Sequence, residues 1–90
     1  MKAYRLKIYG IVQGVWFRAS TKERADQYGI SGWVRNAADG SVEAYAQGPD
    51  EVVDLFLHWC KQGPPGARVD RIETEETPPG PDVRGFMIRR

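Results

Sequence analysis

The chain has 90 residues, of which 41% are hydrophobic and 28% are charged, a composition that excludes a disordered tail. Thirteen lysines and arginines against twelve aspartates and glutamates leave a net charge of +1, which excludes a strong electrostatic field for nucleic acid or membrane surfaces. A chain of this length builds one hydrophobic core, so residues 1–90 are predicted to form a single domain.

The number of cysteines and the length of the apolar runs indicate the cellular compartment. Cys60 is the only thiol and His58 the only histidine, so the chain has neither an internal disulfide nor a Cys/His cluster for a metal. No apolar run reaches the ~18–20 residues of a membrane span, and no apolar signal core follows the N-terminus. We therefore expect a cytoplasmic protein without membrane contact, and nothing in the sequence demands more than a monomer.

A strand and a glycine-bearing turn are predicted first. Residues 3–11 alternate between apolar and polar side chains, with Tyr4, Leu6 and Ile8 on one face. Residues 10–17 hold two glycines among apolar residues, which predicts a turn after that strand.

The first helix is predicted over residues 19–28, with its start placed to within about one turn. Ser20 and Glu23 have the spacing of a capping box, and Gly29 suits the position just past a helix. The side chains on its buried stripe are Phe17, Thr21, Ala25 and Tyr28.

A hairpin and a second helix follow. Residues 30–36 and 41–47 are rich in β-branched and aromatic side chains, and Asp39-Gly40 supplies the turn between them. Pro49 is expected at the first position of the next helix, which ends around Lys61 and Gly63. The apolar stripe of this helix is predicted to be Val52, Phe56, Trp59 and Cys60.

Two more strands are predicted at residues 67–75 and 85–89, on either side of a proline-rich loop over residues 77–83. The resulting order, βαββαβ with a short terminal strand, predicts an α+β fold of the ferredoxin-like α/β sandwich type. Two helices should cover one face of a mainly antiparallel sheet, in which the first strand lies centrally.

The segment from Gly10 to Arg18 is the first candidate for chemistry. A glycine-bearing loop between a strand and a helix can point several backbone N–H groups into one concavity, where the helix dipole favours an anion. Arg18 can offer a planar fork of donors to a phosphate or carboxylate. A plain turn with a surface arginine remains the alternative. The segment lacks the Lys-Ser/Thr pair and the GxGxxG pattern of nucleotide loops, and no cysteine nucleophile precedes Arg18.

The segment from Gly32 to Gly40 is the second candidate. Asn36 lies at the predicted end of a strand, where an asparagine most often forms a turn. From this segment alone, a structural role and a chemical role both stay open.

Together the two segments resemble the two signatures of the acylphosphatase family. The first consists of Ile8, Gly10, Val12-Gln13-Gly14-Val15 and Phe17-Arg18, and the second of Gly32-Trp33-Val34-Arg35-Asn36 with Gly40, Val42 and Gly48. Every defining position matches, and the predicted helices, hairpin and closing strand fall where this family has them.

The resemblance implies a ferredoxin-like sandwich that hydrolyses the carboxyl-phosphate bond of small acyl phosphates without a metal or cofactor. It implies that Arg18 and Asn36 are the catalytic residues, with Asn36 orienting the attacking water. It also implies that the phosphate is held by Arg18 and by the backbone amides of Val12, Gln13, Gly14, Val15, Trp16, Phe17 and Arg18. The family pattern leaves Trp16 unassigned, and no side chain stands out as an acyl pocket, so several acyl groups remain possible.

The residue types fit an anhydride substrate better than an ester. A carboxylate whose acid has a pKa of roughly 4 leaves without protonation, whereas a sugar alkoxide requires a general acid. No such acid is visible near the two segments.

Two other functions remain open at this point. A ferredoxin-like sheet could bind RNA by stacking bases on Tyr9 and Tyr45, although the RNP1-type aromatic run is absent. A domain that handles carbamoyl phosphate is the other, because acylphosphatase-like domains also occur inside hydrogenase-maturation proteins. A start at Met1 and an end just after the last strand favour a stand-alone enzyme. His58 is expected at the surface and Cys60 in the core rather than at a redox site.

Overall fold

The computed structural model describes residues 1–89 and contains the predicted elements in the predicted order. Five strands and two helices alternate along the chain: β1 (Lys2–Ile11), α1 (Phe17–Tyr28), β2 (Ser31–Asn36), β3 (Val42–Gly48), α2 (Asp50–Gln62), β4 (Arg68–Thr77) and β5 (Phe86–Ile88).

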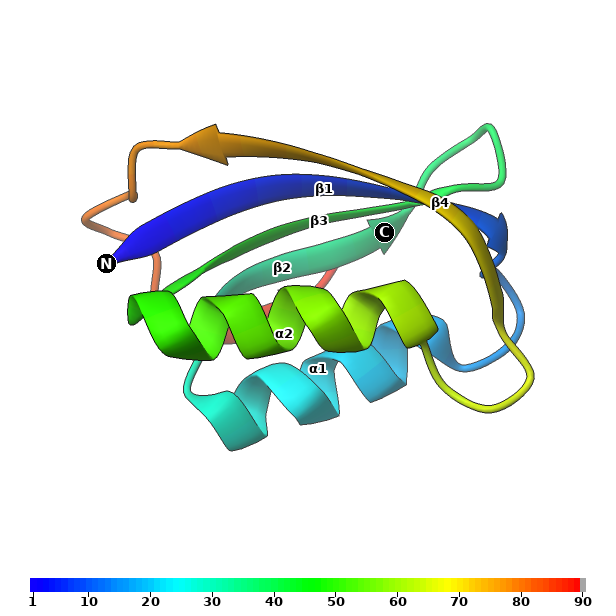
Figure 1. The fold of residues 1–90 in the computed structure, drawn as a ribbon, viewed down its shortest axis with the longest axis horizontal. Coiled ribbons are helices and arrows are strands. Elements are labelled where there is room, and N and C mark those ends of the chain that lie inside the picture. The colour runs from blue at the N-terminus through cyan, green and yellow to red at the C-terminus, as the bar shows by residue number, and fades with distance from the viewer. Residues whose placement is uncertain (90) are drawn as a thin grey trace.

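The strands form one five-stranded sheet in the order β4-β1-β3-β2-β5. All neighbours are antiparallel except β2 and β5, which run parallel, and both helices lie on the same face (Figure 1). This arrangement confirms the predicted ferredoxin-like sandwich. β1 is an interior strand as expected, but β3 is the middle strand, because the short β5 adds to the far edge beyond β2.

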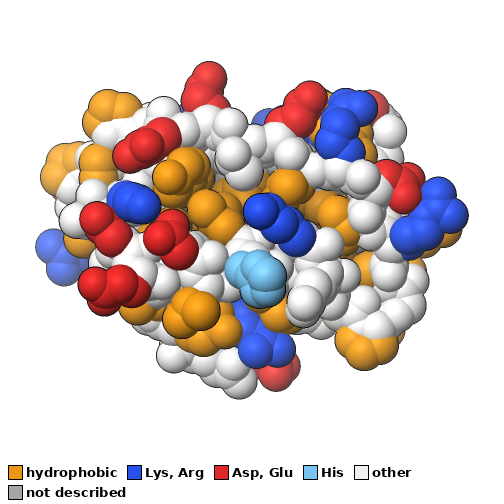
Figure 2. Space-filling view, viewed as in Figure 1, with side chains coloured by type: hydrophobic (Ala, Val, Ile, Leu, Met, Phe, Trp, Pro, Cys, Tyr) orange, Lys and Arg blue, Asp and Glu red, His pale blue; other side chains and the backbone are white. Residues whose placement is uncertain are grey.

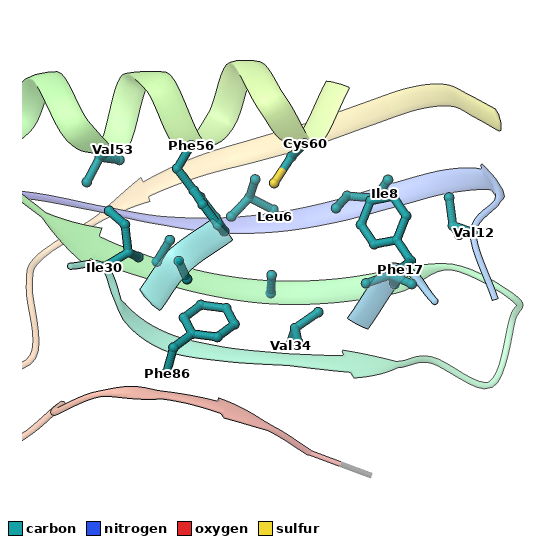
Figure 3. Close-up of a cluster of buried hydrophobic side chains, with 14 residues drawn as sticks. Leu6, Ile8, Val12, Phe17, Ile30, Val34, Val53, Phe56, Cys60 and Phe86 are labelled. Carbon is teal, nitrogen blue, oxygen red and sulfur yellow. The ribbon is translucent and has the colours of Figure 1, made fainter. Parts of the chain in front are cut away.

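The hydrophobic core fills the space between the helices and the sheet (Figure 3). Alternation along β1 turns Leu6 and Ile8 toward the helices, as the sequence predicts. Phe56 of α2 meets Phe86 of β5 edge to face, with ring centroids 5.9 Å apart, so the core also anchors the last strand.

The start of α1 differs from the prediction. The helix begins at Phe17, and Trp16 caps it through a left-handed backbone, with φ 63° and ψ 22°, without a side-chain hydrogen bond. The amide of Ser20 already donates to the carbonyl of Trp16 at 3.0 Å, so Ser20 lies inside the first turn. The predicted capping box is therefore wrong, whereas Gly29 ends the helix in the left-handed conformation expected of it.

The second helix differs from the prediction by one position at its start. Pro49 is the residue before the helix rather than its first residue. The fully buried side chains are Val53, Phe56 and Cys60, whereas Val52 and Trp59 are only partly buried. These side chains are spaced by three and then four residues, so they lie on one face of the helix. The buried stripe begins at Val53 instead of the predicted Val52.

The surface carries charges of both signs, and His58 is exposed as predicted (Figure 2). Cys60 lies in the core, and burial raises the pKa of its thiol, which keeps it protonated and unreactive. Within residues 1–89, no helix is both long and apolar enough to cross a membrane. The compartment and the oligomeric state stay predictions.

Candidate functional site

The topology brings the β1–α1 loop and the ends of β2 and β5 together on the helix-covered face of the sheet. Asn36 is the last residue of β2 and shares a face with the buried Val34, because side chains two apart on a strand point the same way. Ile88 pairs with Val34 in the parallel register and points to that face as well. The start of α1 packs over this end of the sheet, as its contacts with β2 and β5 indicate.

A cavity of about 410 Å³ opens where these segments meet. It brings together Arg18 and Asn36, which lie 18 positions apart in the sequence. Of the other loop residues that the sequence singles out, Val12, Gly14, Trp16 and Phe17 line the cavity, whereas Gln13 and Val15 do not. Ala19 and Ile88 complete the wall. No sequence pattern indicates a role for these two residues, because their place at the cavity depends on how α1 and β5 pack.

The three residues at the start of α1 have different surroundings. Phe17 is buried and packs against Trp59 with ring centroids 6.0 Å apart, and it points into the core (Figure 3). Arg18 is half-buried at the cavity wall, and Trp16 is largely exposed. Phe17 thus fixes the helix end on which Arg18 sits.

The loop beside the cavity contains backbone amides without a backbone acceptor. Within the described chain, no amide from Gln13 to Phe17 donates to a backbone carbonyl. Trp16 is left-handed and Phe17 right-handed, a succession that turns neighbouring N–H groups toward one side. Because the helix N-terminus adds a partial positive charge, this loop can hold an anion.

Gly10 sets the point at which β1 gives way to the loop. Its φ of 134° is strained for other residues, and a Cβ there would lie 2.0 Å from the carbonyl oxygen of Arg68 in β4. The register between β1 and β4 shifts between Tyr9 and Gly10, as in a β-bulge. A glycine is therefore required at this signature position by the close approach of two strands.

The side chain of Gln13 joins the loop to the β2–β3 hairpin. Its Nε2 donates to the carbonyl oxygens of Ala37, at 2.8 Å, and Ser41, at 2.9 Å. Ala37 directly follows Asn36, so this bridge ties the loop that precedes Arg18 to the strand end that carries Asn36. From the sequence Gln13 is expected to contribute only its backbone amide, and the bridging role of its side chain is visible only in the packed structure.

Asp39 orders the hairpin turn that supplies these acceptors. Its carboxylate accepts hydrogen bonds from the hydroxyl and the amide of Ser41 and forms an ion pair with Lys7, whose Nζ is 3.0 Å away. These contacts, with the Ser41 hydroxyl contributing most, hold the pKa of the Asp39 carboxyl well below its usual range. The turn is therefore held by an ionised Asp39 at neutral pH.

Arg18 and Asn36 bring complementary chemistry to the cavity. Among residues 1–89 no carboxylate lies within 4.0 Å of the Arg18 guanidinium, and the cavity wall contains no Asp or Glu. The Oδ1 atom of Asn36 is buried and has no hydrogen-bond partner in that same part of the chain. A buried polar atom without a partner costs about 1–3 kcal/mol, so Asn36 leaves hydrogen-bonding capacity unused beside the cavity.

The family model for acylphosphatase matches residues 4–88. This chain belongs to the acylphosphatase family. An acylphosphatase from Rubrobacter xylanophilus is 51% identical over 88 residues, which cover 98% of this chain and 80% of that protein. The crystal structure of an acylphosphatase from Bacillus subtilis superimposes with a TM-score of 0.96 at 36% identity, covering all of both chains.

Acylphosphatase-like structure also occurs within a longer protein. The crystal structure of HypF from T. kodakarensis matches all of this chain with a TM-score of 0.85 at 36% identity, but the match covers only 12% of that protein. The acylphosphatase fold of this chain is thus similar to whole acylphosphatases and to a small part of a larger chain.

The face of the sheet away from the helices offers poor platforms for RNA bases. Tyr45 is only 8% exposed, and its hydroxyl donates to Gln47 and accepts from the amide of Gly80, in the loop before β5. The ring of Tyr9 is covered by the Arg71 guanidinium, 4.1 Å from its centroid. Neither aromatic ring is free to stack, which disfavours RNA binding here.

The bridge made by Gln13 predicts a loss of stability when its donor is removed. Gln13→Met keeps the length of the side chain but loses both hydrogen bonds, so the free energy of unfolding should fall by about 1–2 kcal/mol. Urea unfolding measures this difference. Gln27→Met on the exposed side of α1 is the matched control, and equal stability of the two variants would contradict the bridging role.

Proposed function

We propose that this chain is an acylphosphatase that hydrolyses acyl phosphates to a carboxylate and inorganic phosphate. The observation that carries the proposal is that Asn36, whose Oδ1 has no partner within residues 1–89, lines the same cavity as Arg18 and the loop residues Val12, Gly14, Trp16 and Phe17. Membership of the acylphosphatase family supports the same activity.

In this mechanism the phosphate group is held by Arg18 and the loop amides. The guanidinium donates to two phosphate oxygens as a planar fork, and the amides from Val12 to Arg18 surround the rest of the phosphate. The absence of carboxylates from the cavity wall favours a dianion there. These groups stabilise the charge that spreads over the equatorial oxygens in the transition state.

Asn36 positions the water. Its side-chain amide accepts one hydrogen of the water molecule, so that an oxygen lone pair points at the phosphorus in line with the leaving group. Asparagine is no general base, and the water proton passes to a phosphate oxygen of the substrate. The new bond joins the water oxygen to phosphorus, and the electrons of the broken bond leave on the carboxylate.

The leaving group explains how so few groups suffice. Because the departing carboxylate belongs to an acid with a pKa of roughly 4, it needs no proton at neutral pH. Of the residues that the structure describes, none in the cavity wall is a histidine, aspartate or glutamate that could supply one. A site that only stabilises charge and positions the reactants is therefore suited to cleaving an acid anhydride and poorly suited to cleaving a phosphate ester.

A substrate panel tests the reaction class. Acetyl phosphate and carbamoyl phosphate should be hydrolysed at least about 100-fold faster than a sugar phosphate, the factor that a missing general acid costs an ester. Excess EDTA should leave the rate unchanged, because Arg18 and the amides perform the charge stabilisation. Rapid ester hydrolysis or a rate abolished by EDTA would contradict this function. Hydrolysis of carbamoyl phosphate alone would favour the alternative of a domain that handles carbamoyl phosphate.

Replacement of Arg18 tests the anion site. Arg18→Ala should lower kcat/KM for acetyl phosphate by on the order of 10³-fold, because the main charge on the transition state loses its partner. Inhibition by inorganic phosphate should weaken in parallel. Arg24→Ala, on the same helix but packed over Trp59 outside the cavity, is the matched control. An unchanged affinity for phosphate would exclude Arg18 as the anion clamp.

Replacement of Asn36 separates water positioning from phosphate binding. Asn36→Ala should lower kcat by on the order of 10²–10³-fold, the cost of one positioned hydrogen bond, while the inhibition constant of phosphate changes little. Because the Oδ1 atom has no partner within residues 1–89, urea unfolding should detect no loss of stability. A parallel fall in phosphate affinity and kcat would make Asn36 a substrate ligand instead.

A further inference from the structure

A second cavity lies on the face of the sheet away from the helices. Tyr45 of β3 pairs with Arg5 of β1 on one side and with Trp33 of β2 on the other. Met87 of β5 pairs with Trp33 and completes the row. Because Val34, the chain neighbour of Trp33, is turned into the core, this row faces away from the helices. The outer groove is the cavity of about 500 Å³ between this row and the loop over residues 78–84.

The loop over residues 78–84 is bonded to the sheet and forms one wall of the outer groove. The amide of Gly80 donates to Gln47 Oε1 at 2.9 Å, and the carbonyl oxygen of Gly80 accepts from Gln47 Nε2 at 3.0 Å. The same amide also donates to the Tyr45 hydroxyl at 3.2 Å. Three of the seven residues of this loop are prolines, which further restrict its backbone. Side chains of β3 thus hold the wall in place.

Three arginines of the outer groove are not paired with an acid. Within residues 1–89, no carboxylate oxygen lies within 4.0 Å of the guanidinium of Arg5, Arg84 or Arg89. Among the described residues that line the groove, Asp82 alone is acidic, and Glu75, opposite Arg5 in β4, lines a neighbouring cavity instead. The outer groove therefore carries a net positive charge, although the net charge of the whole chain is only +1.

The indole of Trp33 is covered by arginines and is not open for stacking. The guanidinium of Arg89 lies 4.9 Å from the ring centroid, and that of Arg35 lies 5.4 Å from it. A guanidinium over an aromatic ring keeps its N–H groups available for an anion. Arg35 uses them for Glu43, 2.7 Å away, whereas within residues 1–89 Arg89 has no such partner. The groove is thus suited to anions and poorly suited to nucleobases.

The positive charges are too far apart for one small anion. Three strand spacings separate β1 from β5, so the backbones that carry Arg5 and Arg89 lie about 14 Å apart. Between them the floor offers the half-buried Trp33 and Met87, which is 59% exposed. A ligand that uses the whole groove needs anions at both ends and apolar surface between them. In an extended peptide, side chains four residues apart point the same way and lie about 13 Å apart, which matches this span.

We propose that the outer groove binds an extended acidic segment of a partner protein. Carboxylates toward its ends pair with Arg5 on one side and with Arg84 and Arg89 on the other. An apolar side chain between them packs on Met87. This interaction goes beyond the proposed hydrolysis and is separate from it, because the catalytic cavity lies on the helix-covered face of the sheet.

The test measures the binding of a designed peptide by fluorescence anisotropy. The probe is fluorescein-labelled Glu-Glu-Leu-Leu-Glu-Glu, in which either face of the extended chain presents a glutamate, a leucine and a glutamate. The neutral control is the same peptide with every glutamate replaced by glutamine. We expect the acidic peptide to bind, with an affinity that falls as salt is added, and the neutral peptide to bind at least about tenfold more weakly.

Three single variants and one double variant place the peptide in the outer groove. Arg5→Gln and Arg89→Gln should each weaken binding by about three- to fivefold, the upper range for an exposed ion pair. The double variant should lose about tenfold or more, because the two sites are far apart and their effects add. Arg68→Gln, which removes an exposed arginine of β4 outside the groove, is the matched control and should leave the affinity unchanged.

Each contrary outcome overturns the inference in a different way. Equal affinities of the double variant and the Arg68→Gln control would show that the peptide does not use the groove, and equal binding of the neutral peptide would remove the role of charge. Weaker binding to Arg18→Ala would place the peptide in the catalytic cavity instead. A labelled oligouridylate that binds more tightly than the peptide, and loses that affinity in the double variant, would assign the groove to nucleic acid.

Discussion

The two hydrogen bonds from Gln13 Nε2 to the carbonyls of Ala37 and Ser41 are the constraint on which the site depends. Arg18 lies on a helix and Asn36 at the end of a strand, and the core beneath them fixes only their approximate positions. The Gln13 bridge joins the connection before α1 to the connection after β2. Because Asp39 holds the hairpin turn in shape, the Gln13 bridge has fixed acceptors beside the strand end that carries Asn36.

Two residues of the site are held in locally unfavourable states, and packing in the rest of the molecule stabilises them. Asn36 carries a buried oxygen without a partner in the described chain, and Trp16 holds an unfavourable backbone conformation. Neither feature would persist on a mobile loop, because small rearrangements would relieve it. Phe17, buried between the core and Trp59, prevents that relaxation by fixing the first turn of α1. The core residue Phe17 is thus the direct neighbour of Trp16, a residue of the cavity wall.

Features set by local pattern could be predicted from the sequence, and features set by packing could not. Alternation along β1 predicts a strand, and the turn residues Asp39-Gly40 predict the hairpin. The family resemblance names Arg18 and Asn36, and the structure places both at one cavity. The predicted capping box at Ser20 is wrong because the backbone of Trp16 caps the helix. No residue pattern predicts a tryptophan at such a cap. The side-chain bridge of Gln13 depends on contacts between segments more than 20 residues apart, beyond the reach of helix and strand periodicity.

Within residues 1–89 the cavity wall has Arg18 as its cation and contains no carboxylate, and this charge also bears on the steps that would follow the proposed reaction. Cleavage converts one bound anion into two, and a single guanidinium cannot neutralise both at close range. Mutual repulsion therefore expels the carboxylate. In the proposed mechanism phosphate keeps its contacts with Arg18 and the loop amides, so we expect it to be the slower product to depart. We therefore expect turnover by such a site to decline as inorganic phosphate accumulates, so that the rate would depend on the phosphate level of its surroundings.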